Sequence, residues 1–256
     1  MLFHALVLTL LTGCADPFGD AKKADTIEAW QQFLETKPGG TDKLMAEKRL
    51  EALLVSRAEE TKKVDDYDAV LKRFPKSKKK KDMQAGRANA AFALAEAEHT
   101  VEGWEKFLKQ NDFADGALKK RAGSMLEVSR YAPSLAIAEP VVQQVNLADD
   151  PKGALDGWGV STEVTNNADK SFDFLTLEVQ FLDADGKKIQ AASYPLVGQV
   201  GPGGMSLEEQ YKPPLAPGDK RAWRYTTGDV PEGWNQKVRV VPIAIRVAGD
   251  AAAKAE

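Results

Sequence analysis

The chain has 256 residues, of which 43% are hydrophobic and 29% charged, values typical of a water-soluble globular protein. This length is sufficient for two domains. The net charge of −3 excludes the strong basic field on which nucleic-acid binding depends, so no nucleic-acid partner is expected.

The first fourteen residues combine a short apolar run with the chain's single cysteine. The run extends from Leu2 to Leu11 and is followed by the small residues Thr12 and Gly13 and by Cys14. It is too short to span a bilayer and ends at small residues, as secretory signals do. This segment resembles the signal peptide of bacterial lipoproteins, with Leu11, Thr12 and Gly13 as the lipobox and Cys14 as the lipidated residue.

The resemblance implies a signal peptide over residues 1–14, a tether over 15–23 and a palmitate-type anchor on Cys14. The class marks inner-membrane retention with an aspartate after the cysteine, whereas this chain has Ala15. We therefore expect a protein anchored in the outer membrane and facing the periplasm. The alternative is a cytoplasmic protein with a buried N-terminal helix and a core cysteine. Asp16-Pro17 disfavours that alternative because proline interrupts helices.

An internal repeat determines the fold expected for residues 24–132. Trp30, Tyr67 and Trp104 recur at an interval of 37 residues, each with apolar residues at −3, +3 and +4. Those offsets place four apolar side chains on one helical stripe. Longer helical patterns lie between the short ones, at 44–58, 83–97 and 118–128. A period of this length made of two helices is typical of an α-solenoid of helical hairpins.

The segment from Tyr67 to Ser77 resembles the second helix and closing turn of tetratricopeptide-like repeats. Similar repeats occur in periplasmic lipoproteins, including the lipoprotein of the outer-membrane β-barrel assembly machinery. The resemblance extends over about residues 24–131 and implies a protein-interaction surface. An irregular helical bundle is the alternative, because two and a half copies make a short array.

After Pro133 the apolar period changes from helical to alternating, which places a domain boundary near 132–140 and an antiparallel β-sandwich at 140–248. Residues 249–256 are expected to be a flexible tail. The predicted strands are 141–146, 158–166, 175–181, 188–194, 205–211, 220–226 and 237–247. In the last of these the apolar phase changes across Pro242, which predicts a bulge or an edge strand. The predicted fold class is therefore α+β with two domains.

Three short motifs in the second half resemble the bacterial sandwich domains called FxLYD. They are Val164-Thr165-Asn166-Asn167, the stretch from Phe181 to Lys187, and Leu215-Ala216-Pro217-Gly218-Asp219. The resemblance implies an immunoglobulin-like sandwich and assigns no catalytic residue.

The sequence offers few residues for catalysis, and no catalytic residue, metal site or cofactor is predicted. His99 is the one histidine outside the expected signal peptide, so a Ser-His pair or a multi-histidine metal site is not expected. His99 itself is interpreted as a surface or capping residue. Asp183-Ala184-Asp185-Gly186 resembles a calcium loop, but a hairpin turn is favoured because Lys187 stands where an oxygen ligand is required.

The most distinctive charged feature is a cluster of cations around Pro75. Its candidate contact residues are Lys76, Lys78, Lys79, Lys80 and Lys81, preceded by Lys72 and Arg73. Consecutive lysines near a helix start repel one another and oppose the helix dipole. Two interpretations stay open: a solvated turn that keeps the repeat soluble, or a contact with lipid phosphates or an acidic partner.

Together these patterns predict a membrane-anchored periplasmic lipoprotein that acts as a protein-interaction or scaffolding module with an envelope protein as partner. One alternative is a polysaccharide-binding module, which an exposed row of Trp158, Trp223 and Trp234 would indicate. Another is a hydrolase that uses two facing carboxylates.

Overall fold

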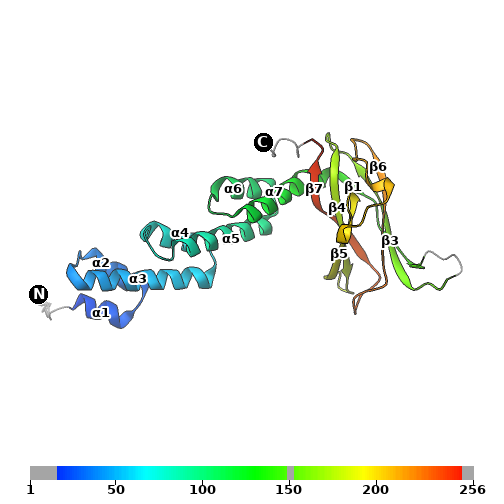
Figure 1. The fold of residues 1–256 in the computed structure, drawn as a ribbon. Coiled ribbons are helices and arrows are strands. Elements are labelled where there is room, and N and C mark those ends of the chain that lie inside the picture. Colours follow the sequence, from blue (N-terminus) through cyan, green and yellow to red (C-terminus); the bar gives the residue numbers. More distant parts are fainter. Residues whose placement is uncertain (1–15, 149–152, 250–256) are drawn as a thin grey trace, which may run out of the picture. The chain divides into compact units, whose positions relative to one another are not determined.

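The computed structural model describes residues 16–148 and 153–249, which form seven α-helices followed by seven β-strands (Figure 1). The lipobox residues and Cys14 lie outside the described residues. The helices are α1 (Pro17–Ala24), α2 (Ile27–Glu35), α3 (Gly40–Thr61), α4 (Val64–Arg73), α5 (Lys80–Glu98), α6 (Val101–Gln110) and α7 (Gly116–Tyr131). The predicted α+β fold is confirmed: helix pairs come first and antiparallel sheets follow.

The strands form two antiparallel sheets that share one core. They are β1 (Leu135–Ile137), β2 (Val141–Val145), β3 (Gly157–Asn166), β4 (Phe172–Leu182), β5 (Lys188–Val197), β6 (Lys220–Thr227) and β7 (Val238–Val247). In one sheet β1, β2 and β6 all pair with β3; in the other the order is β5-β4-β7. Inward-facing side chains of β3 and β4, such as Val160, Val164 and Leu177, meet in a single apolar cluster.

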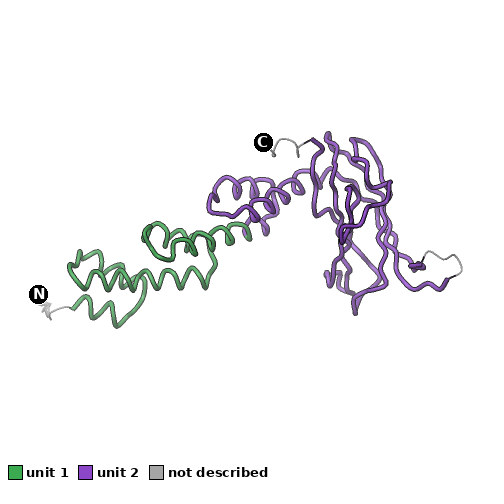
Figure 2. The backbone as a smooth tube through the Cα atoms, in the orientation of Figure 1, with its two compact units in different colours: residues 1–93 green, residues 94–256 purple. Residues whose placement is uncertain are grey.

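The chain divides into two compact units, residues 1–93 and 94–256 (Figure 2). The division falls inside α5, whereas the change from helix to strand lies between Tyr131 and Leu135. Unit 2 therefore contains α6 and α7 as well as the sandwich. The end of α7 packs into the sandwich core, where the Tyr131 ring meets the Phe172 ring edge-on with centroids 5.4 Å apart.

The short helices α2, α4 and α6 begin and end near the residues that the sequence indicates, whereas α1 is formed by residues that were predicted as a tether. Thr26 and Thr100 cap α2 and α6, each hydroxyl accepting the N–H of the residue three positions on. Helix α4 ends at Arg73 because Pro75 disfavours a helical conformation at Phe74. The aromatic residue of the predicted stripe is buried in all three copies, since Trp30 is 3% exposed, Tyr67 6% and Trp104 0%. The position three residues later is also buried in each copy, and the two outer positions of the stripe are half-buried.

The repeat also includes the junction before each short helix, which the apolar pattern does not reveal. Asp25, Lys62 and His99 follow one another at the same 37-residue interval, and each adopts a left-handed conformation with φ between 49° and 53°. Their N–H groups donate to the carbonyls of the buried Ala21, Ala58 and Ala95, respectively. The first helix of each hairpin therefore ends at a residue in the αL conformation, which is a common way for helices to end. His99 is exposed and occupies this capping position, as predicted.

The sandwich confirms six of the predicted strands and corrects the seventh. Residues 205–211 form no strand; they contain one isolated bridge, between Val200 and Ser206, and a 3-10 turn from Glu209 to Tyr211. Leu207 and Tyr211 are buried but Met205 is 68% exposed, so the apolar residues of this segment do not form one buried strand face. Strand β1, which the sequence analysis missed, has only three residues.

Two local predictions in the sandwich are confirmed. The pairing of β4 with β7 shifts register near Pro242, and β7 is an edge strand, so the change of apolar phase is accommodated by an irregularity at an edge. Asp183 begins the turn between β4 and β5, where its carboxylate accepts the N–H groups of Asp185 and Lys187 at 3.0 and 2.9 Å. The aspartate therefore stabilises a hairpin turn.

Asn166 physically joins two of the motifs found in the sequence. Its side chain is fully buried, donates to the carbonyls of Lys170 and Leu215, and accepts the N–H of Ala168. The end of β3 is thereby tied both to the β3–β4 turn and to the turn that precedes β6. The side-chain amide uses both of its N–H donors and one of the two lone pairs of its oxygen. Asparagine therefore satisfies nearly all of its hydrogen-bonding groups at this buried position.

Candidate interaction surface

The predicted cations lie together on the turn between α4 and α5, within unit 1. We call the residues Lys72, Arg73, Lys76 and Lys78–Lys81 the basic turn. Pro75 separates the two helices, and the Ser77 hydroxyl accepts the Lys79 N–H at 2.9 Å just before α5 begins. The turn is therefore built by local hydrogen bonding, and its lysines are free to face solvent.

Every cation of the basic turn is exposed. Lys79 lies 3.7 Å from Asp82, one turn further along, and the Arg73 guanidinium lies over the Phe74 ring at 6.0 Å. No other ion pair involves these seven described side chains. An exposed pair such as Lys79–Asp82 contributes little to stability. The cations are thus available to a charged partner.

The arginines of the helical region behave differently, because most of them join neighbouring helices. Arg57 of α3 pairs with Asp66 of α4 at 2.8 Å, and Arg87 of α5 pairs with Asp68 of α4 at 2.5 Å. In unit 2, Arg130 of α7 pairs with Glu105 of α6 at 2.5 Å. Planar guanidinium groups suit such bridges. These arginines therefore bridge neighbouring helices, whereas the lysines of the basic turn form no such bridge.

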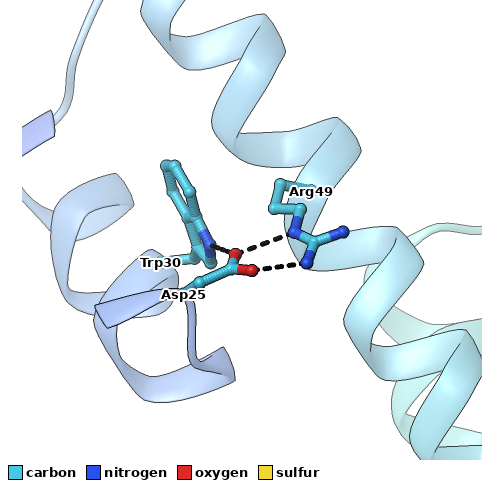
Figure 3. Close-up of polar contacts among 3 residues, drawn as sticks. All are labelled: Asp25, Trp30 and Arg49. Atoms are coloured by element: carbon cyan, nitrogen blue, oxygen red, sulfur yellow. Dashed lines mark hydrogen bonds and ion pairs between the residues drawn. The ribbon is translucent and has the colours of Figure 1, made fainter. Parts of the chain in front are cut away.

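The best-connected of these bridges lies at the first hairpin (Figure 3). The Asp25 carboxylate accepts two hydrogen bonds from Arg49 of α3, one of them at 2.7 Å, and one from the Trp30 indole at 3.0 Å. The bonds from Arg49 and Trp30 hold the pKa of Asp25 at about 2, below its ordinary 3.8. Asp25 thus stays charged over nearly the whole pH range and ties the α1–α2 junction to α3. This site is structural.

A cavity of about 500 Å³ lies between the basic turn and α3. One wall carries Arg73, Lys76 and Lys78, and the other carries Glu47 and Glu51 of α3. Phe74, Pro75 and Ser77 complete its lining. The two glutamates are four residues apart and share one face of α3, so they lie side by side and do not face each other.

The sandwich offers cavities of a different kind. One of about 260 Å³ is lined by Tyr194, Glu208, Arg224 and Tyr225, among others. In the described part of the chain, no group of three or more histidine, cysteine or acidic residues could hold a metal ion. The same residues include no helix that is both long and apolar enough to cross a membrane.

The three sandwich tryptophans do not form an exposed row. Trp223 is 1% exposed and belongs to the core. Trp158 and Trp234 are half-buried and pack edge-on against each other with centroids 5.1 Å apart. The Trp234 indole donates to the Lys237 carbonyl at 2.8 Å. These rings therefore serve the packing of the sandwich.

Comparisons with known proteins assign no family. No protein-family model matches the chain, and no curated protein matches it. Among solved structures, the chain matches a crystal structure from Bordetella pertussis described as an ApaA protein, with 15% sequence identity and a TM-score of 0.23. The match covers 44% of this chain and 90% of the other.

Proposed function

We propose that the chain is a lipid-anchored protein of the bacterial cell envelope that acts as an interaction or scaffolding module and not as an enzyme. The observation that carries this proposal is the basic turn. Its seven cations are exposed and, apart from Lys79, have no acidic partner within ion-pair distance. Cations near the start of a helix oppose its dipole, at a cost of about 0.3–1 kcal/mol each. A partner that bears negative charge would offset this cost.

The anchor is proposed on Cys14, through the lipobox formed by Leu11, Thr12 and Gly13. Helix α1 begins at Pro17, three residues beyond Cys14, and three residues span at most about 11 Å. Unit 1 would therefore lie next to the lipid surface. Because Ala15 follows the cysteine, the proposed location is the periplasmic face of the outer membrane.

The resemblances to tetratricopeptide-like repeats and to FxLYD domains also support a binding role. The hairpins of 37 residues with αL junctions fit tetratricopeptide-like repeats, whose usual role is to bind other proteins. The bonds from Asn166 to the turn before β6 give a physical reason for two of the FxLYD-like motifs. We therefore infer an envelope protein as partner, without a cofactor, a metal or nucleic acid.

A polysaccharide-binding role is less well supported, because it would require exposed aromatic rings in a row and Trp223 is buried. A hydrolase that uses two carboxylates is also less well supported. Glu47 and Glu51 stand on one wall of their cavity, opposite cations instead of opposite each other.

Crosslinking in intact envelopes tests the proposal. The variant replaces Lys78–Lys81 with glutamine, and a matched control replaces four exposed lysines elsewhere: Lys106, Lys109, Lys170 and Lys187. We expect both variants to be anchored like the wild type. The first should lose crosslinked partners and the control should keep them. Equal crosslinking by the wild type and both variants would contradict a role for the basic turn.

A further inference from the structure

We infer that the cavity between α3 and the basic turn binds a phosphoethanolamine group, a phosphate ester that also carries a primary ammonium, as in a phospholipid head group. This inference rests on the lipid-anchored function proposed above and assigns a ligand to the cavity, which lies beside the lysines proposed to contact a protein partner. It starts from the division of charge within the cavity, which the repeat itself does not require.

The two walls carry opposite charges that do not neutralise each other. Arg73, Lys76 and Lys78 line one side and Glu47 and Glu51 the other, yet no ion pair joins these five described residues. Facing charges that are too far apart to pair leave space for a ligand that contacts both. The ligand must then carry negative charge at one end and positive charge at the other.

A phosphate fits the cationic wall. Arginine offers a planar fork of N–H donors that matches phosphate oxygens, and lysine binds phosphate as a point charge. Arg73 is kept in place by its position over the Phe74 ring. The Lys76 and Lys78 ammonium groups are exposed and can move toward a bound phosphate.

A primary ammonium fits the acidic wall. Glu47 and Glu51 are half-buried, and neither makes an ion pair with a protein side chain. An ammonium with three N–H donors can bridge two adjacent carboxylates by charge-assisted hydrogen bonds. A quaternary choline group has no N–H donor, so the cavity should distinguish the two head groups.

The surroundings favour a lipid over a free phosphate ester as the source of this group. Leu44 lies three residues before Glu47 on the same face of α3, and its side chain is 67% exposed. An exposed apolar residue one helical turn from a residue that lines a charged cavity suits the glycerol and acyl part of a lipid. The proposed anchor at Cys14 places unit 1 beside such lipids.

Calorimetry with the full chain in an uncharged maltoside detergent tests the inference. The probes are glycerophosphoethanolamine, which is the diester found in lipids, phosphoethanolamine and inorganic phosphate. Variant E47Q/E51Q should bind glycerophosphoethanolamine about tenfold more weakly and phosphate unchanged, because only the ammonium contact is lost. Variant K76Q/K78Q should weaken both by a similar factor. The control E59Q/E60Q, at exposed glutamates near the end of α3, should change neither.

A second arm separates the lipid from the free ester. In vesicles that contain phosphatidylethanolamine, amide exchange over residues 74–82 of the lipidated chain should be slower than in phosphatidylcholine vesicles, and L44S should reduce that difference. Binding of the monoester alone, with no difference between vesicles, would assign the cavity to a free phosphate ester and overturn the lipid assignment.

Two further results would overturn the inference as a whole. One is phosphoethanolamine binding no tighter than phosphate and insensitive to E47Q/E51Q. The other is binding of a hexaglutamate peptide, lost in K76Q/K78Q, without binding of either ethanolamine ester, which would assign the basic turn to an acidic protein. Neither result affects the lipidation of Cys14, so failure of this inference is distinguishable from failure of the proposed anchor.

Discussion

At the scale of single residues, a few polar side chains fix the positions of whole segments. Asp25 joins the first hairpin to α3 through Arg49 and Trp30, and Asn166 joins three segments of the sandwich. Asp25 is partly exposed whereas Asn166 is fully buried. Their loss should therefore have different consequences.

Acid should weaken the Asp25 junction in a defined range. The pKa of Asp25 is about 2 in the folded chain and 3.8 in the reference state. The carboxylate therefore contributes stability in full above about pH 4, and this contribution is lost as the pH falls toward 2. Between pH 4 and 2 the wild type should lose more stability than D25N, whose side chain does not titrate. Parallel acid titrations by denaturant unfolding measure the difference; identical curves would contradict the assigned bonds.

Replacement of Asn166 by alanine should destabilise unit 2 by about 2–4 kcal/mol, because the fully buried amide and its three hydrogen bonds are lost. The Lys170 carbonyl and the Ala168 N–H lose their bond to this side chain, and the Leu215 carbonyl keeps only the bond from the Phe172 N–H. Asn167→Ala is the matched control, since the neighbouring side chain is exposed, and it should change stability by less than about 0.5 kcal/mol. Denaturant unfolding followed by tryptophan fluorescence reports both. A small effect at Asn166 would show that these bonds are not important for the fold.

At the scale of elements, the helical repeat keeps its backbone while its side chains diverge. The αL junctions at Asp25, Lys62 and His99 have the same backbone conformation although their side chains differ: a carboxylate, an ammonium and an imidazole. Gly86 and Gly123 likewise stand 37 residues apart, but the space around them differs. A Cβ at Gly86 would lie 2.4 Å from Cε1 of Tyr67, whereas a Cβ at Gly123 would meet nothing within 4 Å.

This difference predicts opposite effects for the same substitution. Gly123→Ala should stabilise the chain by about 0.5–1 kcal/mol, because alanine favours the helix and has room. Gly86→Ala should destabilise it by about 1–3 kcal/mol, because the Tyr67 ring must move. Thermal and denaturant unfolding of both variants provide the comparison.

A double-mutant cycle identifies the cause. Tyr67→Ala alone should cost about 3–5 kcal/mol as a buried aromatic. In that background Gly86→Ala should no longer be destabilising, since the ring that opposes it is gone. If Gly86→Ala is equally destabilising with and without the ring, the close approach of Tyr67 to α5 is not the reason for this glycine.

The αL junctions give a third prediction for the elements. Lys62 is an exposed residue other than glycine at φ 53°, a conformation that costs an L-residue about 1–2 kcal/mol. Lys62→Gly should therefore stabilise unit 1 by up to about 1 kcal/mol, even after the added freedom of the unfolded chain. Asp25→Gly at the equivalent position should destabilise it, because the bonds to Arg49 and Trp30 are lost. The two unfolding free energies should thus change with opposite signs.

The elements also show which features a sequence can predict. Helices α2, α4 and α6 were predictable because the apolar stripe repeats three times, because Pro75 marks the end of α4 and because threonines cap the starts of α2 and α6. Helix α1 was not predicted, since it is short and belongs to no copy of that stripe. Residues 205–211 were predicted wrongly as a strand, since the apolar residues there belong to a segment with one isolated bridge and a 3-10 turn. The cavity beside the basic turn was not predictable: it brings α3 against a turn more than twenty residues away, and pairing of that kind leaves no local pattern.

At the scale of the whole molecule, the chain consists of a helical unit that bears the basic turn and a unit that contains the sandwich. The proposed function depends on where the chain is located, because the exposed lysines and the cavity between α3 and the basic turn can bind lipid head groups only beside a lipid surface. That location in turn depends on the lipobox and Cys14.

Intact mass spectrometry of the protein extracted from membrane fractions tests whether Cys14 is lipidated and where the chain is located. We expect a wild-type chain that begins at Cys14, carries acyl chains and is found in the outer membrane. For Cys14→Ala we expect an unlipidated, uncleaved precursor. Wild-type protein that is recovered from the cytoplasm with Met1 intact and no acyl mass would contradict the proposed anchor and location.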